Sequence, residues 1–199
     1  MNFITKPYNQ TKFLDFLAQK FPKFEKISSP IATDINNDKV VACTFFGDVE
    51  LDDESSLGFF EFEVSDNTDI ENNRVGFNSF LKKQIDNNIL NCAIAVFYNP
   101  NKTKWRLSFI KIDYDENLKE FATPPTRASF ILGEDTPLKT IKSQIENLKT
   151  SSIKSLADAF SVEPVSKQFF IEYKALYKTL CEDIGPLIFR KDIRRGHTW

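Results

Sequence analysis

The chain has 199 residues, enough for one large domain or for a globular domain with an appendage. Hydrophobic residues make up 41% and charged residues 27%, and the 20 phenylalanines predict a core rich in aromatic side chains. The net charge of -2 argues against an electrostatic field over the whole chain that would attract nucleic acids or membranes. A local basic face is still compatible with this charge.

The cysteine and histidine content argues against a zinc site and against a histidine-dependent catalytic triad. The three cysteines are scattered without a Cys-x-x-Cys pair, and the one histidine is His197. No apolar run reaches the length of a membrane span, and the N-terminus lacks a signal-peptide pattern. We therefore expect a cytoplasmic protein with no membrane partner. The basic ending "FRKDIRRGHTW" leads us to expect a fragment of a longer chain.

The first part of the chain alternates helical and strand patterns. "NQTKFLDFLAQKF" has apolar residues at helical spacing, with Thr11 as the expected N-cap and Pro22 after its end. The run "ILNCAIAVFYN" is almost continuously apolar, which is typical of a central strand covered on both faces. Together with a helix over 73–88, we expect strands over 29–35, 39–51, 58–64, 89–99, 104–114 and 126–132.

The pattern changes near residue 133 and becomes helical. Helices are expected over 135–149, 152–160 and 163–184. The last one has Phe169, Tyr173, Leu176 and Leu180 on one side, and Tyr177 lies one turn from Tyr173. This spacing suits a helix pair or a neighbouring domain better than catalysis. We predict an α/β domain over 1–133 and a helical segment over 134–199.

The stretch "GFFEFEV" contains two glutamates inside an apolar strand. Alternate residues of a strand share a face, so we expect Glu61 and Glu63 on one face and Phe60, Phe62 and Val64 on the other. Two interpretations stay open for the glutamates. They could form the solvated side of the strand, or they could be a pair of metal ligands.

The expected order of helix, three strands, helix and strand is that of the PD-(D/E)xK nuclease core. In such nucleases, acids on two neighbouring strands hold Mg²⁺, which polarises the phosphate and helps to generate hydroxide. The corresponding metal ligands would be Asp48, Glu61 and Glu63, with both glutamates also catalytic. Glu63 stands where the nuclease pattern has lysine, so Lys82 or Lys83 would have to steady the phosphate. Asp48 also fits the acidic tip of a hairpin.

Three basic residues are candidate DNA contacts. Arg74 precedes the two helical lysines, and Lys104 and Arg106 flank Trp105. Arginine and lysine are the usual phosphate-binding side chains. The alternative for Arg74 is a solvated helix face, and Trp105 also suits the edge of a core or a cation–π pair.

Four stretches occur in order between about Gly58 and Leu180: "FEVSDNTDIENNRVGFNSFL", "WRLSFI", "TPPTRASFILGEDTPLKTI" and "LADAFSVEPVSKQFFIEYKALY". Together they resemble the N-terminal region of type IIG restriction-modification enzymes. These single-chain enzymes join a nuclease to an adenine-specific DNA methyltransferase.

The resemblance implies that this chain leads a longer polypeptide whose methyltransferase and target-recognition parts lie further on. S-adenosylmethionine would bind only in that downstream part, because "YNPNK" does not match the Asn-Pro-Pro-Tyr type motif. The N-terminal part would be a Mg²⁺-dependent endonuclease acting on double-stranded DNA, with Glu61, Glu63 and Asp48 at its site. The missing lysine leaves a second possibility, a non-catalytic module that binds DNA or docks against the other parts.

Overall fold

The observed elements follow the predicted alternation of helices and strands. The computed structural model describes residues 3–27, 31–33, 39–72, 74–101, 103–114, 120–122, 128–136, 139–146, 148–161 and 169–182. Residues 1–161 form one compact unit and residues 162–199 a second. The elements of the first unit are η1 (Phe3–Thr5), α1 (Gln10–Lys20), β1 (Ile31–Thr33), β2 (Val40–Glu50), β3 (Ser56–Val64), α2 (Arg74–Asn87), β4 (Cys92–Tyr98), β5 (Lys104–Tyr114), β6 (Glu120–Ala122), β7 (Ser129–Gly133), α3 (Lys139–Glu146) and α4 (Ile153–Phe160).

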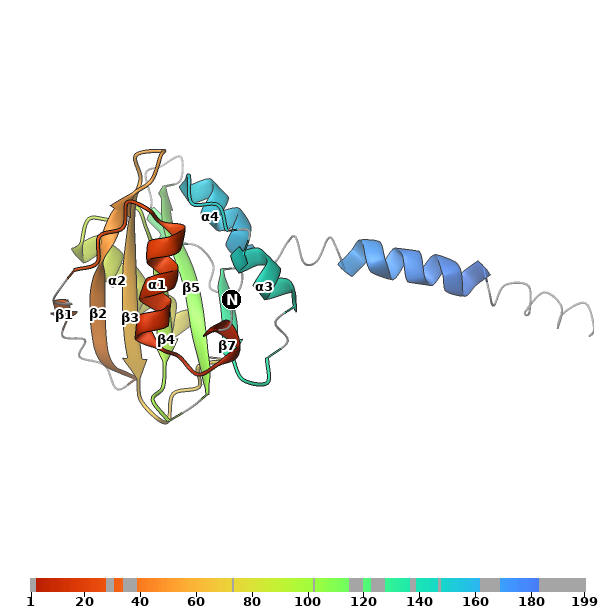
Figure 1. Cartoon of the computed structure of the whole chain (residues 1–199), viewed down its shortest axis with the longest axis horizontal. Coiled ribbons are helices and arrows are strands. Elements are labelled where there is room, and N and C mark those ends of the chain that lie inside the picture. Colours follow the sequence, from red (N-terminus) through yellow and green to blue (C-terminus); the bar gives the residue numbers. More distant parts are fainter. Residues whose placement is uncertain are drawn as a thin grey trace, which may run out of the picture. The chain divides into compact units, whose positions relative to one another are not determined.

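One mixed sheet organises the first unit (Figure 1). Among the described residues it has seven strands in the order β1-β2-β3-β4-β5-β6, and β7 also pairs with β5. Neighbouring strands are antiparallel except β3 and β4, which are parallel and are joined by the crossover helix α2. The predicted α/β class, a mixed sheet flanked by helices, is confirmed. The predicted order of helix, three strands, helix and strand appears as α1, β1 to β3, α2 and β4.

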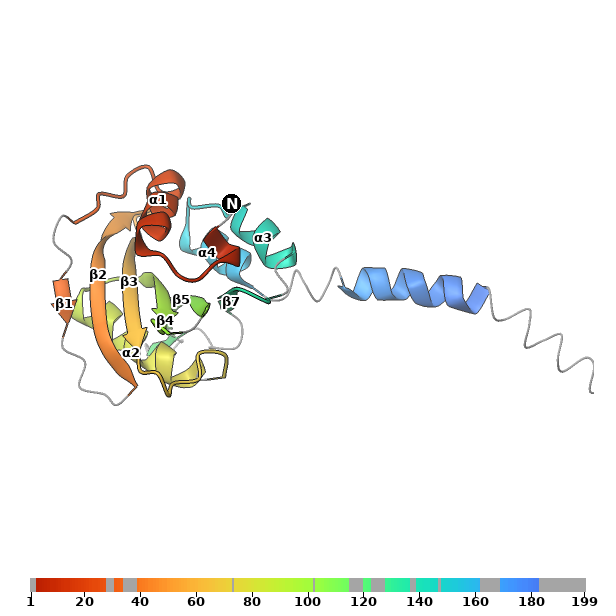
Figure 2. The same ribbon diagram turned by 60° about the horizontal axis from the view of Figure 1, so that its bottom comes forward.

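The two faces of the sheet have separate cores. Figure 2 shows α1, α3 and α4 on one face, which we call the α1 face, and α2 on the other, the α2 face. On the α1 face, Phe21 and Phe24 meet Phe59 edge-on, with ring centroids 5.0 and 4.9 Å apart. On the α2 face, Phe62 stacks on Phe97 at 4.6 Å. Aromatic packing in both layers accounts for the high phenylalanine content.

Helix α1 begins two residues earlier than the Thr11 cap would require. Asn9 is the N-cap, and its Oδ1 accepts a hydrogen bond from the Lys12 backbone N–H at 3.0 Å. The helix ends at Lys20, two residues before Pro22. This start places Tyr8 and Gln10 on either side of the cap, and both side chains contact Glu61 of β3 from there.

A β-bulge interrupts the pairing of β2 with β3. Phe45 pairs with Phe60 and Gly47 pairs with Phe59, so Phe46 is an extra residue on β2. Gly47 has a φ of 125°, a conformation that favours glycine. Every β2 residue after the bulge is therefore turned to the face opposite to the one that simple alternation predicts.

The first unit extends beyond the predicted domain boundary at residue 133. Ile145 of α3 and Leu156 and Phe160 of α4 are buried in the α1-face core, so both helices belong with the sheet. Phe160 stacks on Phe109 and on Phe130, with centroids 5.4 and 5.1 Å apart. In the second unit the described residues are helical over 169–182, inside the helix predicted over 163–184.

Candidate functional site

Glu61 and Glu63 lie side by side on the α1 face of the central strand β3, as predicted. Phe60 and Phe62 point into the α2-face core, which leaves the glutamates on the opposite face. In the parallel pairing with β4, Glu63 lies next to Tyr98. The alternation prediction for this strand is therefore confirmed.

The Glu61 side chain is shielded from solvent, and both of its carboxyl oxygens already accept hydrogen bonds. It is buried, with 6% of its surface exposed. The Tyr8 hydroxyl donates a short hydrogen bond to Oε2, and Gln10 Nε2 donates to Oε1 at 3.0 Å. Both carboxyl oxygens are thus held by the segment that leads into α1, through hydrogen bonds that are strongest when Glu61 is ionised.

Glu63 is half-buried and held more weakly. The Tyr98 hydroxyl donates to its Oε2 at 3.3 Å. The rings of Tyr8 and Tyr98 lie 4.7 Å apart, which joins the two pairs. We call Tyr8, Gln10, Glu61, Glu63 and Tyr98 the acid–tyrosine cluster.

Burial controls the protonation of this cluster. It raises the pKa of Glu61, against the hydrogen bonds from Tyr8 and Gln10, and the nearby Glu63 charge raises that pKa further. Burial and the Glu61 carboxylate also raise the pKa values of Tyr8 and Tyr98 well above the ordinary tyrosine value. The two phenols therefore stay protonated and act as hydrogen-bond donors at neutral pH.

Asp48 does not join the two glutamates. It pairs with Gly58, which lies on the α2 face of β3, because the bulge at Phe46 has shifted the register. Its side chain is exposed. Across the same ladder, Thr44 is opposite Glu61 and Ala42 is opposite Glu63, so β2 adds no acid there. In the part of the chain that the structure describes, no three acidic, cysteine or histidine side chains form a metal-binding group.

The candidate catalytic lysines also lie on the other side of the sheet. Lys82 and Lys83 are on α2, whose Leu81 and Ile85 pack into the α2-face core. Lys82 forms an ion pair with Asp86 at 3.4 Å, and Lys83 is exposed. Neither lysine reaches the acid–tyrosine cluster, since the sheet lies between them.

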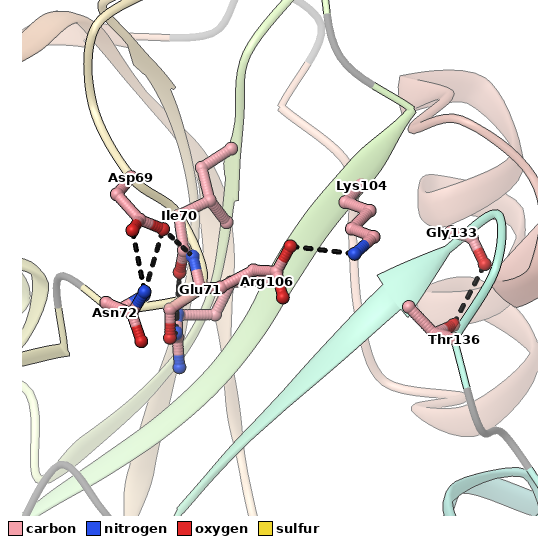
Figure 3. Close-up of polar contacts among 8 residues, drawn as sticks. All are labelled: Asp69, Ile70, Glu71, Asn72, Lys104, Arg106, Gly133 and Thr136. Atoms are coloured by element: carbon pink, nitrogen blue, oxygen red, sulfur yellow. Dashed lines mark hydrogen bonds and ion pairs between the residues drawn. The ribbon is translucent and has the colours of Figure 1, made fainter.

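Two of the candidate DNA contacts have structural partners instead (Figure 3). Arg106 is buried, and its Nη2 donates to the carbonyls of Ile70 and Glu71 at 2.5 and 2.7 Å. Its Nη1 donates to Ser129 Oγ at 2.7 Å. Figure 3 shows Lys104 directed at Glu71, with which it forms a 2.7 Å ion pair. Arg74 begins α2, and its side chain lies outside the described residues.

Arg106 shapes the loop between β3 and α2. Its hydrogen bonds hold the backbone at Ile70 and Glu71, and Asp69 closes the adjacent turn by accepting from the N–H groups of Glu71 and Asn72 at 2.9 and 3.1 Å. A surface hollow of about 580 Å³ lies beside this loop and includes Lys104 in its wall. The buried guanidinium thus supports the fold, with its donors directed at oxygens of the protein itself.

Sequence reasoning missed Tyr8, Gln10 and Tyr98. Tyr98 occupies the position beside Glu63 on β4, which a correct strand register would have identified. Tyr8 and Gln10 are 53 and 51 residues from Glu61, and no local pattern links them to it. The displacement of Asp48 did leave a signal, because a glycine inside a strand pattern, here Gly47, often marks a bulge.

In comparisons with known proteins, no family model, no curated protein and no solved structure matches this chain. Within the residues that the structure describes, no helix has both the length and the apolar character needed to cross a membrane.

Proposed function

We propose that the chain is a non-catalytic module of a cytoplasmic restriction-modification polypeptide, which docks against the methyltransferase and target-recognition parts of that polypeptide. One observation carries the non-catalytic assignment. The acids and cations expected to form a nuclease site are divided between the two faces of the sheet, with Glu61 and Glu63 on one and Asp48, Lys82 and Lys83 on the other.

A Mg²⁺-dependent site needs several oxygen ligands that converge with open coordination positions. Here Glu61 already accepts hydrogen bonds on both oxygens, and Glu63 is the one acid beside it among the residues that the structure describes. The pKa of Glu61 is raised because burial disfavours the charged form of the side chain. The side chains in this place do not fit a bound Mg²⁺ ion.

The sequence supports the assignment to a restriction-modification polypeptide through the order of the four stretches that resemble the type IIG N-terminal region. The arrangement of α1, β1 to β3, α2 and β4 agrees with a nuclease-derived scaffold. S-adenosylmethionine would then belong to the downstream methyltransferase. DNA binding by this module has less support than docking, because Arg106 is buried and Lys104 is paired with Glu71.

The second candidate is the Mg²⁺-dependent endonuclease. The observation in its favour is the pair of carboxylates on one face of the central strand, Glu61 and Glu63. To bind a metal there, Glu61 would have to give up its hydrogen bonds with Tyr8 and Gln10.

Two assays on the 199-residue chain separate the candidates. The first is calorimetric titration with Mn²⁺ and with Mg²⁺, and the second is cleavage of supercoiled double-stranded DNA with each metal. We expect no binding heat and no cleavage. Heat or cleavage that disappears in Glu61→Ala/Glu63→Ala but persists in the matched variant Lys82→Ala/Lys83→Ala would overturn the non-catalytic assignment. The cleavage assay also detects a metal site that DNA phosphates complete.

A further inference from the structure

The helix over residues 169–182 has an apolar face made of exposed side chains. Apart from Ile171, the large apolar side chains of this helix fall within an arc of about 120° at 3.6 residues per turn. They are Phe169, Phe170, Tyr173, Leu176, Tyr177 and Leu180, and each is 52–67% exposed. Lys178 and Glu182 lie on the other side of the helix, and Glu172 borders the apolar face.

The spacing along this face is that of helices that pair. Phe169, Tyr173, Leu176 and Leu180 follow one another at intervals of four, three and four residues, as the a and d positions of a heptad do. The aromatic rings are already ordered in a row. Phe169 stacks on Tyr173 at 6.1 Å, and Tyr173 stacks on Tyr177 at 6.3 Å. A preformed row loses little side-chain freedom when it is covered.

The area of the face is sufficient for a small interface. Aromatic side chains have surfaces of about 150–250 Å², so each exposed side chain offers on the order of 100 Å². One helix could then bury roughly 600 Å², and a pair roughly 1,200 Å², the lower end of the range for specific interfaces. A patch of this size is also at the upper end of what monomers leave exposed.

The charges on the helix allow it to meet its own copy. Glu172 and Glu182 balance Lys174 and Lys178, so two copies bring no excess of like charge together. Lys178 and Glu182 are 3.8 Å apart on the same helix, away from the apolar face. A twofold pair would use the same face on both partners. We propose that this face pairs with that of a second copy of the chain, so that residues 169–182 form a symmetric dimer contact.

Sedimentation equilibrium of the 199-residue chain tests the proposal, under reducing conditions so that the exposed Cys181 cannot link two copies. We expect the mass to rise from 23.0 kDa toward twice that value as concentration increases. Leu176→Glu/Leu180→Glu places carboxylates in the contact and should weaken the dimer at least about 100-fold. The matched control is Ile171→Glu, because Ile171 is 61% exposed on the opposite side of the helix. It should leave the dimer constant within about threefold.

Three results would overturn the proposal. One is a monomer mass at every concentration, which is the result expected if another protein, or another part of a longer polypeptide, covers this face. The second is a dimer that persists in Leu176→Glu/Leu180→Glu. The third is a dimer that Ile171→Glu disrupts equally. The thermal transition of the first unit confirms that each variant remains folded there, since residues 162–199 form a separate unit. The outcomes of the metal-titration and DNA-cleavage assays do not depend on any of these three results.

Discussion

Replacing Tyr8 by phenylalanine removes the hydroxyl that donates to Glu61 and keeps the ring that packs on Tyr98. A hydrogen bond to a charged group contributes about 1.5–3 kcal/mol, and Glu61 is buried, so water replaces the lost donor poorly. We expect Tyr8→Phe to lower the free energy of unfolding by about 2 kcal/mol at pH 7.5. For a domain of this size, that loss lowers the melting temperature by roughly 4–8 °C.

The size of this loss should depend on pH in a defined direction. The pKa of Glu61 is raised in the folded protein, chiefly by burial. Such a group contributes stability that is present below the unfolded pKa of about 4.3 and is lost as pH rises through the folded pKa. The Tyr8 hydrogen bond opposes this rise, so its removal is most costly where Glu61 is ionised. At low pH, Tyr8→Phe removes only a neutral hydrogen bond and should cost about 1 kcal/mol.

Urea unfolding of wild type and Tyr8→Phe at pH 7.5 and pH 4 measures both values. The matched control is Tyr98→Phe, which removes a longer bond, 3.3 Å, to the half-buried Glu63 and should cost less than about 1 kcal/mol. Glu61→Gln removes the charge, so combining it with Tyr8→Phe should abolish the pH dependence. An equal loss for Tyr8→Phe at both pH values, or an equal loss in Tyr98→Phe, would refute the assignment of a buried, charged Glu61 held by Tyr8.

Three further predictions concern the contacts of Arg106, the paired serines of β5 and β7, and the three cysteines. Arg106→Met keeps much of the buried methylene chain but leaves two carbonyls of the β3–α2 loop without their donor, at about 1–3 kcal/mol each, so urea unfolding should show a loss of about 2–5 kcal/mol. A loss below about 1 kcal/mol would contradict the role of Arg106 in holding that loop. Ser129→Ala removes an Arg106 partner and should cost about 1–2 kcal/mol in urea unfolding. Ser108→Ala, at the paired position, removes a buried hydroxyl that has no hydrogen-bond partner among the described residues, and it should be neutral or stabilising. The reverse order of the two losses would contradict these assignments. In the folded protein a thiol reagent at pH 8 should modify the exposed Cys181 alone. Burial raises the pKa of Cys92 to about 12, and Cys43 is also buried. All three thiols should react in denaturant.

Much of the fold could be predicted because the signals are local. The apolar run of β4, the alternation in β3 and the helical spacing in α1 depend on residues close in sequence, and each element formed where its pattern lies. The shared face of Glu61 and Glu63 was predictable for the same reason. The period of a strand fixes which neighbours lie together, whatever packs on the sheet.

The candidate site depended on contacts that no local pattern encodes. A single extra residue at Phe46 turned Asp48 to the other face of the sheet, and the crossover of α2 put Lys82 on that face as well. The start of α1 brought Tyr8 against Glu61 across 53 residues of sequence. Strand period determined that two glutamates would share a face. Only the tertiary packing decided that one of them would be buried and hydrogen-bonded, because burial is a property of what covers a strand and not of the strand itself.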